Sequence, residues 1–529
     1  MLLQYTIWIS LIGAFLVAMI PARDPGSIRW TALFSMVGSL AVAVAAYARY
    51  DAVAGGYQDV LAMNWIPSLG AQFLLGADGI SLPLLVLTGV IGLTGVLFSW
   101  NVAHRTKEFF IYYLILIAGV YGVFLSMDLL LLFVFLEIAI VPKYFLISIW
   151  GSTRREYAAM KLVLYSFVAS VMILIGLLCL HAQYRALTGI HTFDVRFFVE
   201  NAWLLPHGFQ LWCFPLVFLG FATLAGLFPL HTWAPTGHVA APTAASMLLA
   251  GVVMKMGSYG CLRAGLLLFP HGLQEPVLFF DFLVPQFWFW TFAGLAVFGI
   301  VYGAGASLVQ KDFKFVVGYS SVSHMGFVIL GIVTANALGL TGALLQMISH
   351  GLIGALLFAC VGRMIYDRTH TRHLDALPAF DLRSRMPALT AIVIVAFLAS
   401  AGLPGMSGFI AEFTVLLGTM KVSPLLCAAV GLGILVTFAY SLRLLHLVFW
   451  TTPVHGVQNA ECHEPLPPLT LPEKLASGIL IFLIVLIGLL PHTVTGVMQS
   501  SIEQSLRQMN KKADIQTPPL AQKPSPVHP

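Results

Sequence analysis

The sequence predicts an all-α polytopic membrane protein with about fourteen transmembrane helices, and two observations carry that prediction. Of the 529 residues, 59% are hydrophobic and only 9% are charged, whereas about a quarter of an ordinary soluble domain is charged. In addition, apolar runs of roughly 20 residues, the length that spans a bilayer, recur along the whole chain. They lie near 3–21, 30–48, 80–101, 109–127, 128–150, 159–181, 209–230, 240–268, 286–307, 313–334, 337–366, 386–417, 422–450 and 474–495.

Composition also excludes several classes of function. The net charge of +5 is spread over the connections, and no basic stretch is dense enough to indicate a nucleic-acid partner. The six cysteines are scattered, with no CxxC pair and no His/Cys cluster, so no iron–sulfur or zinc site is expected on this chain. The first apolar run lacks a basic flank and a cleavage site, and we expect it to be retained as a helix.

The seventh and eighth runs meet in a stretch, 221–260, that combines helix breakers with a charge. Gly226, Pro229 and Pro242 interrupt the hydrophobic sequence, and Lys255 lies deep within the run that follows. A break at membrane depth is tolerated only where protein or a water-filled cavity covers the freed backbone groups. An ionisable residue inside a membrane helix indicates a functional site. Together these features predict an ion path in this part of the chain.

A weak internal repeat accompanies this break. AGLFP at 225–229 is echoed by AGLPG at 401–405, and each interrupts an apolar run. Interrupted helices at corresponding places in two halves are typical of transporters built from inverted repeats. The sequence therefore predicts two inverted five-helix repeats, spans 4–8 and 9–13, with spans 7 and 12 interrupted. The chain would then have four parts. Residues 1–108 form helices 1–3 and an extramembrane loop, 109–268 the first repeat, 286–450 the second repeat, and 451–529 helix 14 and a polar tail.

The connections between runs carry three further expectations. Residues 49–79 lie outside the membrane and contain the apolar stretch VLAMNWIP, which favours a short hairpin. The fourth and fifth runs nearly meet at Ser126–Asp128, which requires a tight turn. The tail after Gln499 is polar, and from Thr517 it is rich in proline, which predicts disorder at its end.

Basic residues gather in the connections after odd-numbered runs, and this pattern predicts the orientation of the chain. Short cytoplasmic loops are enriched in Lys and Arg. The odd connections contain Arg23, Arg29, Arg105, Lys107, Arg154, Arg155, Lys311, Lys314, Arg368, Arg372, Arg383 and Arg385. The exceptions are Arg185, Arg196 and Lys421 after even runs, and Glu461 and Glu464 after the thirteenth. On balance, we expect the odd connections in the cytoplasm and both termini on the non-cytoplasmic side.

Single ionisable residues lie inside five of the runs: Glu137, Lys255, His324, His350 and Glu412. Burial in hydrocarbon disfavours the charged form, so each needs a partner inside the bundle or a change of protonation. Imidazole titrates near neutrality, although a lone membrane histidine can also simply hydrogen-bond a carbonyl. A solute pocket would cluster its polar groups, whereas a line of single groups favours proton transfer through hydrated cavities.

Lys143 and two histidines have open interpretations. Lys143 follows Glu137 by six residues, about 240° of helical rotation, so the two do not lie side by side unless Pro142 distorts the helix. Lys143 either snorkels toward one membrane face or joins the same polar axis. His231 and His238, which flank the first break, either cap helix ends or carry protons.

Motifs along nearly the whole chain resemble the antiporter-like membrane subunits of respiratory complex I. They include LGADGISLPLLVLTG, MDLLLLFVFLE (ending at Glu137), PLHTWAPTGHVAAPTAASMLLAGVVMK (ending at Lys255), KDFKFVVGYSSVSHMGF, QMISHGL, YDRTHTRHLD and GLPGMSGFIAEF. The same superfamily contains subunits of multisubunit sodium/proton antiporters and of membrane-bound hydrogenases.

The resemblance implies a proton-translocating subunit of an NADH–quinone oxidoreductase in the inner (plasma) membrane, driven by quinone reduction elsewhere in the assembly. This chain would carry no redox centre, and FMN, iron–sulfur clusters and quinone would belong to partner subunits. Its partners would be the lipid bilayer and membrane-arm neighbours on both sides. By position, Glu137, Lys255 and Glu412 are similar to the family's charged residues on spans 5, 8 and 12. His324 and His350 correspond to its histidines on the connecting helices.

One departure from the family pattern concerns the first half of the chain. The family usually has a lysine five residues before the proline of PLH, and this position is Leu224 here. The family also has an apolar residue at the position of Lys143, so we hypothesise that Lys143 restores the missing positive charge. The alternatives are an antiporter-like subunit of a sodium/proton antiporter or hydrogenase, and a structural paralogue that does not pump.

Overall fold

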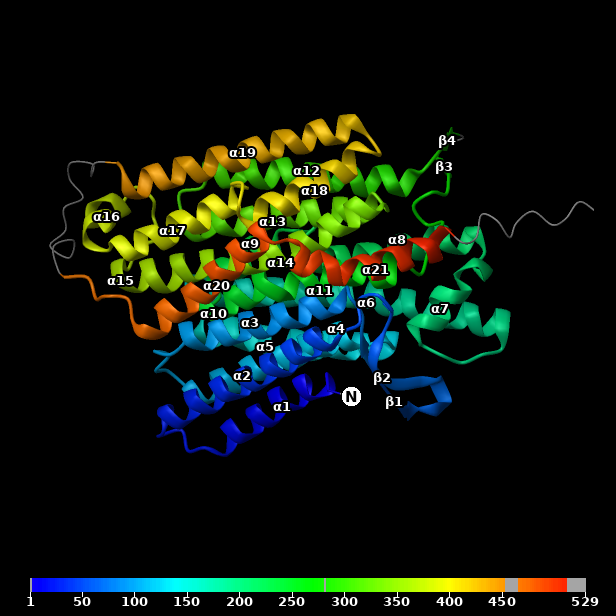
Figure 1. Cartoon of the computed structure of the whole chain (residues 1–529), viewed down its shortest axis with the longest axis horizontal. Helices are drawn as coiled ribbons and strands as arrows, with labels where there is room; N and C mark the ends of the chain where they lie inside the picture. The colour runs from blue at the N-terminus through cyan, green and yellow to red at the C-terminus, as the bar shows by residue number, and fades with distance from the viewer. Residues whose placement is uncertain (1, 280–281, 452–464, 511–529) are drawn as a thin grey trace, which may run out of the picture.

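The computed structural model describes residues 2–279, 282–451 and 465–510, and its helices run side by side along the long axis of the molecule (Figure 1). By length and composition, twelve described helices suit a membrane crossing, or thirteen if one bent pair is counted as a single span. The predicted all-α polytopic fold is therefore confirmed. The twelve are α2 (Pro25–Arg49), α3 (Ser81–Phe98), α4 (Thr106–Leu125), α5 (Leu129–Trp150), α6 (Arg155–Thr188), α8 (His207–Ala225), α10 to α11 with two π-helical segments (Thr243–Leu266), α12 (Phe287–Val309), α13 (Phe313–Val333), α14 to α15 (Ala337–Thr369), α19 (Pro424–Phe449) and α20 (Leu471–Leu489).

The two remaining expected spans are shorter helices. The first is α1 (Gln4–Met19), which has 16 residues and ends where Ile20 turns extended before Pro21, because a residue that precedes proline disfavours helical geometry. The twelfth is divided into α17 (Pro387–Ser400) and α18 (Ser407–Met420), each of 14 residues. The bent pair joins Leu377–Arg385, which contains α16 (Leu382–Arg385), to α17 at 105°.

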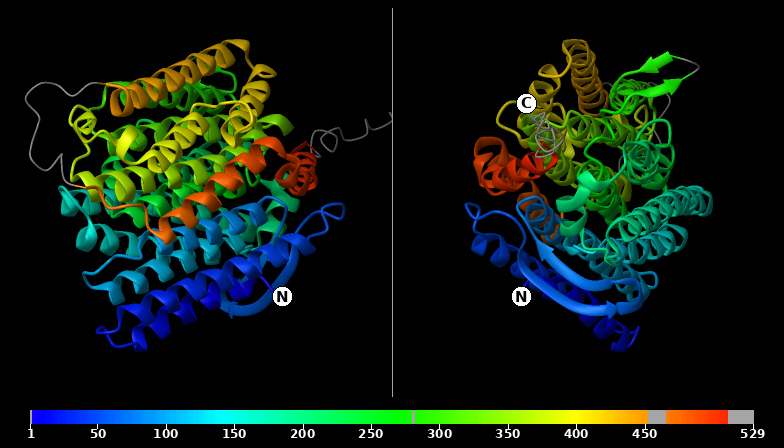
Figure 2. Two further views of the ribbon diagram at one scale, coloured as in Figure 1. Left: turned by 60° about the vertical axis from the view of Figure 1, so that its left-hand side comes forward. Right: turned by 90° about the vertical axis from the view of Figure 1, so that its right-hand side faces the viewer.

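The chain crosses the bundle from one edge to the other. The N-terminal helices α1 and α2 form one edge and α19 forms the opposite edge (Figure 2). Between them lie the helix Thr243–Leu266, here called the Lys255 helix, which is buried from Ala244 to Leu266, and α14 (Ala337–Ala359), which is buried from Gly342 to Ala359. The central helices have polar groups to satisfy within the protein, whereas the outer helices expose apolar side chains that suit lipid.

The hairpin and the tight turn expected from the sequence are both present. Strands β1 (Gln58–Ile66) and β2 (Ala71–Ala77) pair antiparallel at one end of the bundle. Helix α4 ends at Leu125 and α5 begins at Leu129. Asp128 caps α5 by accepting hydrogen bonds from the Leu130 and Leu131 amides at 2.9 and 3.0 Å, and it also accepts one from Gln72 N at 2.9 Å. One carboxylate therefore ties the hairpin to the start of α5. The short helix α7 (Val195–Asn201) and strands β3 (Val277–Phe279) and β4 (Phe282–Val284) lie in other connections.

Both expected helix breaks are present, and a left-handed glycine follows each preceding helix. Helix α8 ends at Ala225, where Gly226 has φ +87°, and α9 (Trp233–Ala240) follows. Trp233 Nε1 donates to the carbonyl of Thr223 at 2.9 Å, which satisfies a group that the break has freed. At the second break Gly402 has φ +73°, a conformation that glycine adopts without steric cost.

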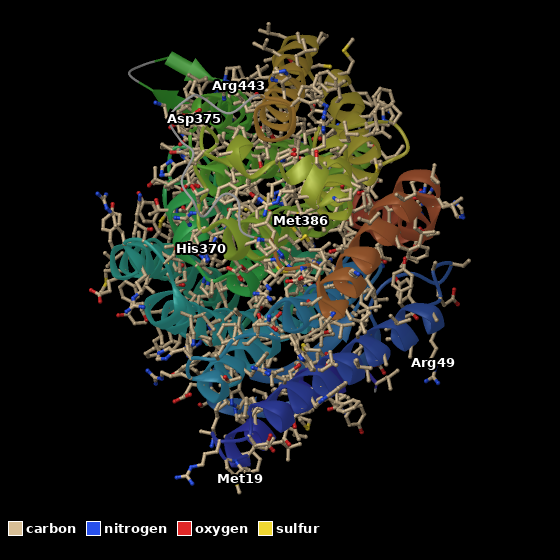
Figure 3. The ribbon with its side chains drawn as sticks, turned by 90° about the vertical axis from the view of Figure 1, so that its left-hand side faces the viewer. Met19, Arg49, His370, Asp375, Met386 and Arg443 are labelled. Carbon is tan, nitrogen blue, oxygen red and sulfur yellow. The ribbon has the colours of Figure 1, made fainter. Side chains whose placement is uncertain are left out.

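The connections that follow odd-numbered spans share one end of the molecule, here called the basic end. Figure 3 looks onto this end, with His370, Asp375 and Met386 labelled. Arg372 joins several of these connections. Its guanidinium donates to Val239 O at 3.1 Å and to Ser152 Oγ at 3.4 Å, and it forms an ion pair with Asp312 at 3.4 Å. One arginine thus holds together the connections after spans 5, 7, 9 and 11.

The C-terminal region differs from the sequence prediction. We expected a last span near 474–495 and a polar tail after Gln499. Instead α20 ends at Leu489, and a second helix, α21 (His492–Asn510), continues the chain. It has one buried face, which includes Met498 and Ile502, and Ser501 Oγ accepts from the amide of Gly79 at 3.0 Å. The segment looks polar in sequence because its other face is hydrophilic. The tail beyond 510, predicted to be disordered, lies outside the described residues.

Candidate functional site

Lys255 lies at the centre of the bundle and is fully buried. The π-helical segment Leu249–Val253 comes just before it, and such segments leave carbonyls without their usual partner. Lys255 Nζ donates to one of them, Ala250 O. The same nitrogen lies 2.6 Å from Nδ1 of His350. Lys255 is thus held between its own helix and α14 by two polar contacts.

A second polar pair continues from His350. The imidazoles of His350 and His324 are tilted by 35°, with ring centroids 5.4 Å apart. His324 Nε2 lies 3.2 Å from Oε1 of Glu412, and both side chains are almost completely buried. Four residues predicted separately from the sequence therefore form one line across α11, α14, α13 and α18.

Hydrogen-bond roles fix the orientation of the His324 ring. The carbonyl of Ser320 can only accept, so His324 Nδ1 donates to it across 2.8 Å. Nε2 lies within reach of two oxygens, Oε1 of Glu412 and the carbonyl oxygen of Ser400, the latter at 3.3 Å. At the other end of the line, Lys255 Nζ either donates to Nδ1 of His350 or, as a neutral amine, accepts from it.

The first-half residues have a different environment. Glu137 is half-buried, on the outward stripe of α5 that also includes the exposed Val141, whereas Lys143 is only 4% exposed. Oε1 of Glu137 is enclosed and has no hydrogen-bond partner among the described residues. Lys143 and Glu137 interact electrostatically. Leu224, where the family usually has a lysine, is buried in α8.

His238, for which the sequence left two interpretations open, lies in the last turn of α9. It is fully buried and stacks on Phe358 with ring centroids 4.7 Å apart. Neither ring nitrogen has a partner among the described residues. Electrostatically, His238 interacts with Lys314 on one side and with Lys255 and His350 on the other.

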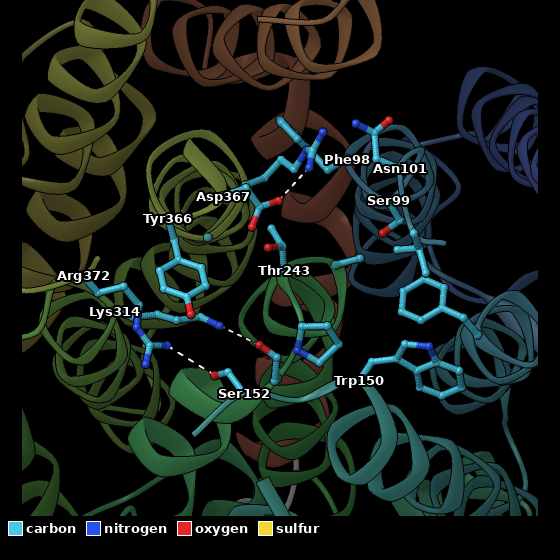
Figure 4. A pocket seen from close by; sticks show the side chains of 17 residues that line it. Phe98, Ser99, Asn101, Trp150, Ser152, Thr243, Lys314, Tyr366, Asp367 and Arg372 are labelled. Carbon is cyan, nitrogen blue, oxygen red and sulfur yellow. Dashed lines mark hydrogen bonds and ion pairs between the residues drawn. The ribbon is translucent and has the colours of Figure 1, made fainter. Parts of the chain in front are cut away.

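A cavity of about 270 Å³ lies at the basic end, and Lys314 forms part of its wall (Figure 4). It opens where α9 gives way to the Lys255 helix, and Ala241, Pro242 and Thr243 form part of its wall. Lys314 lines it and donates to Ala241 O at 2.6 Å. Its size is sufficient for a group of water molecules. We call this cavity the vestibule; its remaining wall includes Ser99, Trp150, Arg363, Tyr366, Asp367 and Arg372.

A buried ion pair at the opposite end of the Lys255 helix was missed in the sequence. Arg263 pairs with Asp78, and the two side chains are only 4% and 5% exposed. The guanidinium lies 5.4 Å from the ring of Tyr57 and 5.3 Å from that of Tyr259. Burial raises the pKa of the Tyr57 phenol, which keeps it neutral beside Arg263. Asp78 lies in LGADGIS, yet nothing in sequence links it to an arginine 185 residues away.

Comparisons with known proteins show the family and the fold of the chain. The model of the family described as NADH:quinone oxidoreductase/Mrp antiporter, transmembrane, matches residues 126–438. NADH-quinone oxidoreductase subunit M of Rhodobacter capsulatus is 36% identical over 504 residues, which cover 94% of this chain and 93% of that protein. A chain of respiratory complex I from Thermus thermophilus with bound NADH is 26% identical, with a TM-score of 0.84 over 96% of this chain and 99% of its own.

The fold and the line of buried groups define the chain as an antiporter-like membrane subunit, and it belongs to the NADH:quinone oxidoreductase/Mrp antiporter transmembrane family. Within that family it is similar to subunit M, as the motifs HTRHLD and GLPGMSGFIAEF indicate. A chain of the Mrp complex from Dietzia sp. has a TM-score of 0.79 over 95% of this chain and 99% of that chain, at 20% identity, which shows a shared fold alone. No group of three potential metal ligands occurs among the described residues.

Proposed function

We propose that the chain is a proton-translocating membrane-arm subunit of an NADH–quinone oxidoreductase. The observation that carries this proposal is the line from Lys255 through His350 and His324 to Glu412. Contacts of 2.6 Å and 3.2 Å form its two ends. A proton on Lys255 can pass to His350, and one on His324 can pass to Glu412. The two pairs are separated by one ring-to-ring step of 5.4 Å between centroids, which a water molecule would bridge.

The vestibule provides the loading route in this proposal. Water in the vestibule would meet Lys314, and His238, which interacts electrostatically with both Lys314 and Lys255, would carry the proton from one to the other. A neutral imidazole accepts a proton on one nitrogen and releases one from the other, so it transfers charge without rotating far. The odd connections would face the cytoplasm because of their basic residues, so protons would be taken up there and both termini would lie on the opposite side.

Glu137 and Lys143 would form a separate polar pair that takes the place of the family's glutamate–lysine pair. The outward position of Glu137 on an otherwise apolar stripe needs a cover, because a carboxylate facing lipid is costly. A neighbouring membrane-arm subunit packed on α5 would supply that cover. Residues 109–268 and 286–450 would be the two inverted repeats. FMN, iron–sulfur clusters and quinone would be held by partner subunits, whose electron transfer drives this chain.

The test is proton translocation by the complete assembly in sealed vesicles with Glu412→Gln. Glutamine keeps the shape but cannot exchange a proton, so the number of protons moved per NADH oxidised should fall. Glu412→Asp should retain part of the activity, since the acid is kept on a shorter side chain. As a control, Glu503→Gln changes an exposed acid on α21 and should have no effect. Equal stoichiometry in the wild type and Glu412→Gln would reject the proposal.

A sodium/proton antiporter subunit is the second candidate, and the observation that favours it is that the matched family also contains Mrp antiporter subunits. Purification of the native assembly separates the two. A soluble arm that oxidises NADH supports the first proposal, and an assembly made only of membrane subunits supports the second.

A further inference from the structure

The vestibule has an accessible acid and a buried amine in the same wall. Asp367 and Lys314 both line this cavity (Figure 4). The side chain of Asp367 is 40% exposed, whereas Lys314 is only 4% exposed. The cavity therefore connects a carboxyl group that meets bulk water with an amine that bulk water does not reach.

The charge of the vestibule wall makes this acid distinctive. Among the described residues that line the cavity, Asp367 is the only acid, and the cations are Lys314, Arg363 and Arg372. Asp312 pairs with Arg372 at 3.4 Å from outside the wall, and α17, which packs on the π-helical segment Cys360–Tyr366, contributes no charged residue. A positively charged cleft repels hydronium ions, as it repels other cations. The Asp367 carboxylate is thus the group of this wall that attracts an arriving proton.

A chain of ion pairs holds the Asp367 carboxyl group in this place. Arg363 Nη1 lies 2.6 Å from Oδ2 of Asp367, and Arg363 Nε lies 2.7 Å from Oε1 of Glu473 on α20. Glu473 is 1% exposed, and its other oxygen, Oε2, accepts from Arg368 and from the amide of Thr470, each at 2.8 Å. The accessible acid is therefore fixed, through one arginine, to a buried acid that several contacts hold.

We propose that Asp367 collects protons at the entrance of the vestibule and delivers them to Lys314 through water in the cavity. The Asp367 carboxylate takes a proton from a hydronium ion or a buffer acid outside and gives it to a water molecule in the vestibule. That water passes one of its own protons to the neutral amine of Lys314. Asp367 and the water regain their starting protonation, and Lys314 gains one proton.

The residues behind Asp367 have a different role in this step. Arg363 and Glu473 exchange no proton in it and act as positioning residues for the carboxyl group. The step rests on the proposed function, in which the vestibule is the loading route. It adds the group that first binds the proton.

The test measures the initial rate of proton translocation by the complete assembly in sealed vesicles. The pH is alkaline and the buffer dilute, so that free protons are scarce. Asp367→Asn removes the collecting group, and Asp367→Ser is a second neutral variant. Glu108→Gln is the matched control, because Glu108 is 41% exposed and pairs with Arg105 at 3.4 Å, but lies outside the vestibule wall. Each measurement is repeated with added imidazole, a mobile proton carrier that titrates near neutrality.

Both neutral variants of Asp367 should slow translocation by about tenfold in dilute buffer, the low end of the effect that a charged cleft has on the arrival of an oppositely charged species. Imidazole should restore most of the wild-type rate, because a carrier replaces a lost collecting group but does not repair a distorted structure. Asp367→Glu keeps the acid and should stay near the wild-type rate, as should Glu108→Gln.

Two results would overturn the proposal: slow Asp367 variants that imidazole does not restore, or Asp367 variants that are as fast as Glu108→Gln. The proposed function is tested separately by Glu412→Gln. If that variant leaves the number of protons per NADH unaltered, the proposed function fails. If it lowers this number while the Asp367 variants match the control, only the collecting role of Asp367 fails.

Discussion

Gly402 lies directly against the carboxyl group of Glu412. A side-chain carbon added at Gly402 would lie 3.2 Å from Oε2 of Glu412, and the backbone there has φ +73°. The break in the twelfth span therefore does more than end α17. It places Gly402 next to Glu412, the last acid of the line. Because Gly402 has no side chain, the carboxyl group of Glu412 fits beside its backbone.

Gly402→Ala should reduce proton translocation while the assembly still forms. The methyl group displaces the Glu412 carboxyl group, and a left-handed alanine costs about 1–2 kcal/mol. Gly405→Ala is the matched control, because its φ is +91° but its added carbon meets Leu489 at 3.8 Å and does not meet Glu412. Proton stoichiometry of both variants is compared at equal protein content. Equal losses would show that backbone strain alone matters.

His238→Phe should slow the loading of Lys255. Phenylalanine keeps the stacking on Phe358 but cannot carry a proton from the vestibule. His231→Phe is the control, because His231 is also buried. It stacks on Phe228, meets Tyr302 edge-to-face and interacts electrostatically with Lys161. Translocation rates should fall for the first variant and remain near the wild-type value for the second. The reverse order would reject the vestibule route.

Lys143→Met should weaken proton translocation if Lys143 serves as the positive partner of Glu137. The loss follows because Glu137 then has no cation on its own helix. Adding Leu224→Lys, which places a lysine where the family usually has one, should restore part of the rate. Translocation that Lys143→Met leaves unchanged would rule out the compensating role of Lys143.

Arg263→Met should destabilise the folded chain strongly. Removing one partner leaves Asp78 buried and uncompensated, which costs about 3–5 kcal/mol. The double variant Asp78→Asn/Arg263→Met should be less unstable, because asparagine can still accept the hydrogen bonds from the Ile80 and Ser81 amides that Asp78 accepts at 3.1 and 3.0 Å. The midpoint of thermal unfolding of the purified assembly measures both. A double variant less stable than Arg263→Met would contradict this account.

Sequence reasoning predicted the line from Lys255 to Glu412 because a charge in a hydrocarbon run must find a partner inside the protein. Lys255, His324, His350 and Glu412 each met that condition, and the structure brings all four together. Glu137 met the same condition in sequence but lies on an outward stripe, because burial on one face depends on neighbouring helices that sequence does not place. The contact between the segment near Gly79 and α21 was unpredictable for the same reason.

Local signals predicted the breaks and connections well. The glycines and prolines in AGLFP and AGLPG predicted the ends of α8 and α17. The apolar stretch before Pro67 predicted the hairpin. Helix α21 was missed because its apolar residues cover one face only and its average composition is polar. The ion pair of Asp78 and Arg263 was missed because each residue looks like the end of a run, and only the packed bundle brings them together.

The most direct test of the central claim is proton translocation by the assembly with Lys255→Met. Methionine keeps the volume of the side chain but cannot hold a proton next to His350. The account predicts that fewer protons cross the membrane per NADH oxidised, while oxidation of NADH by an artificial electron acceptor is unchanged. An unaltered number of protons per NADH in this variant would contradict it.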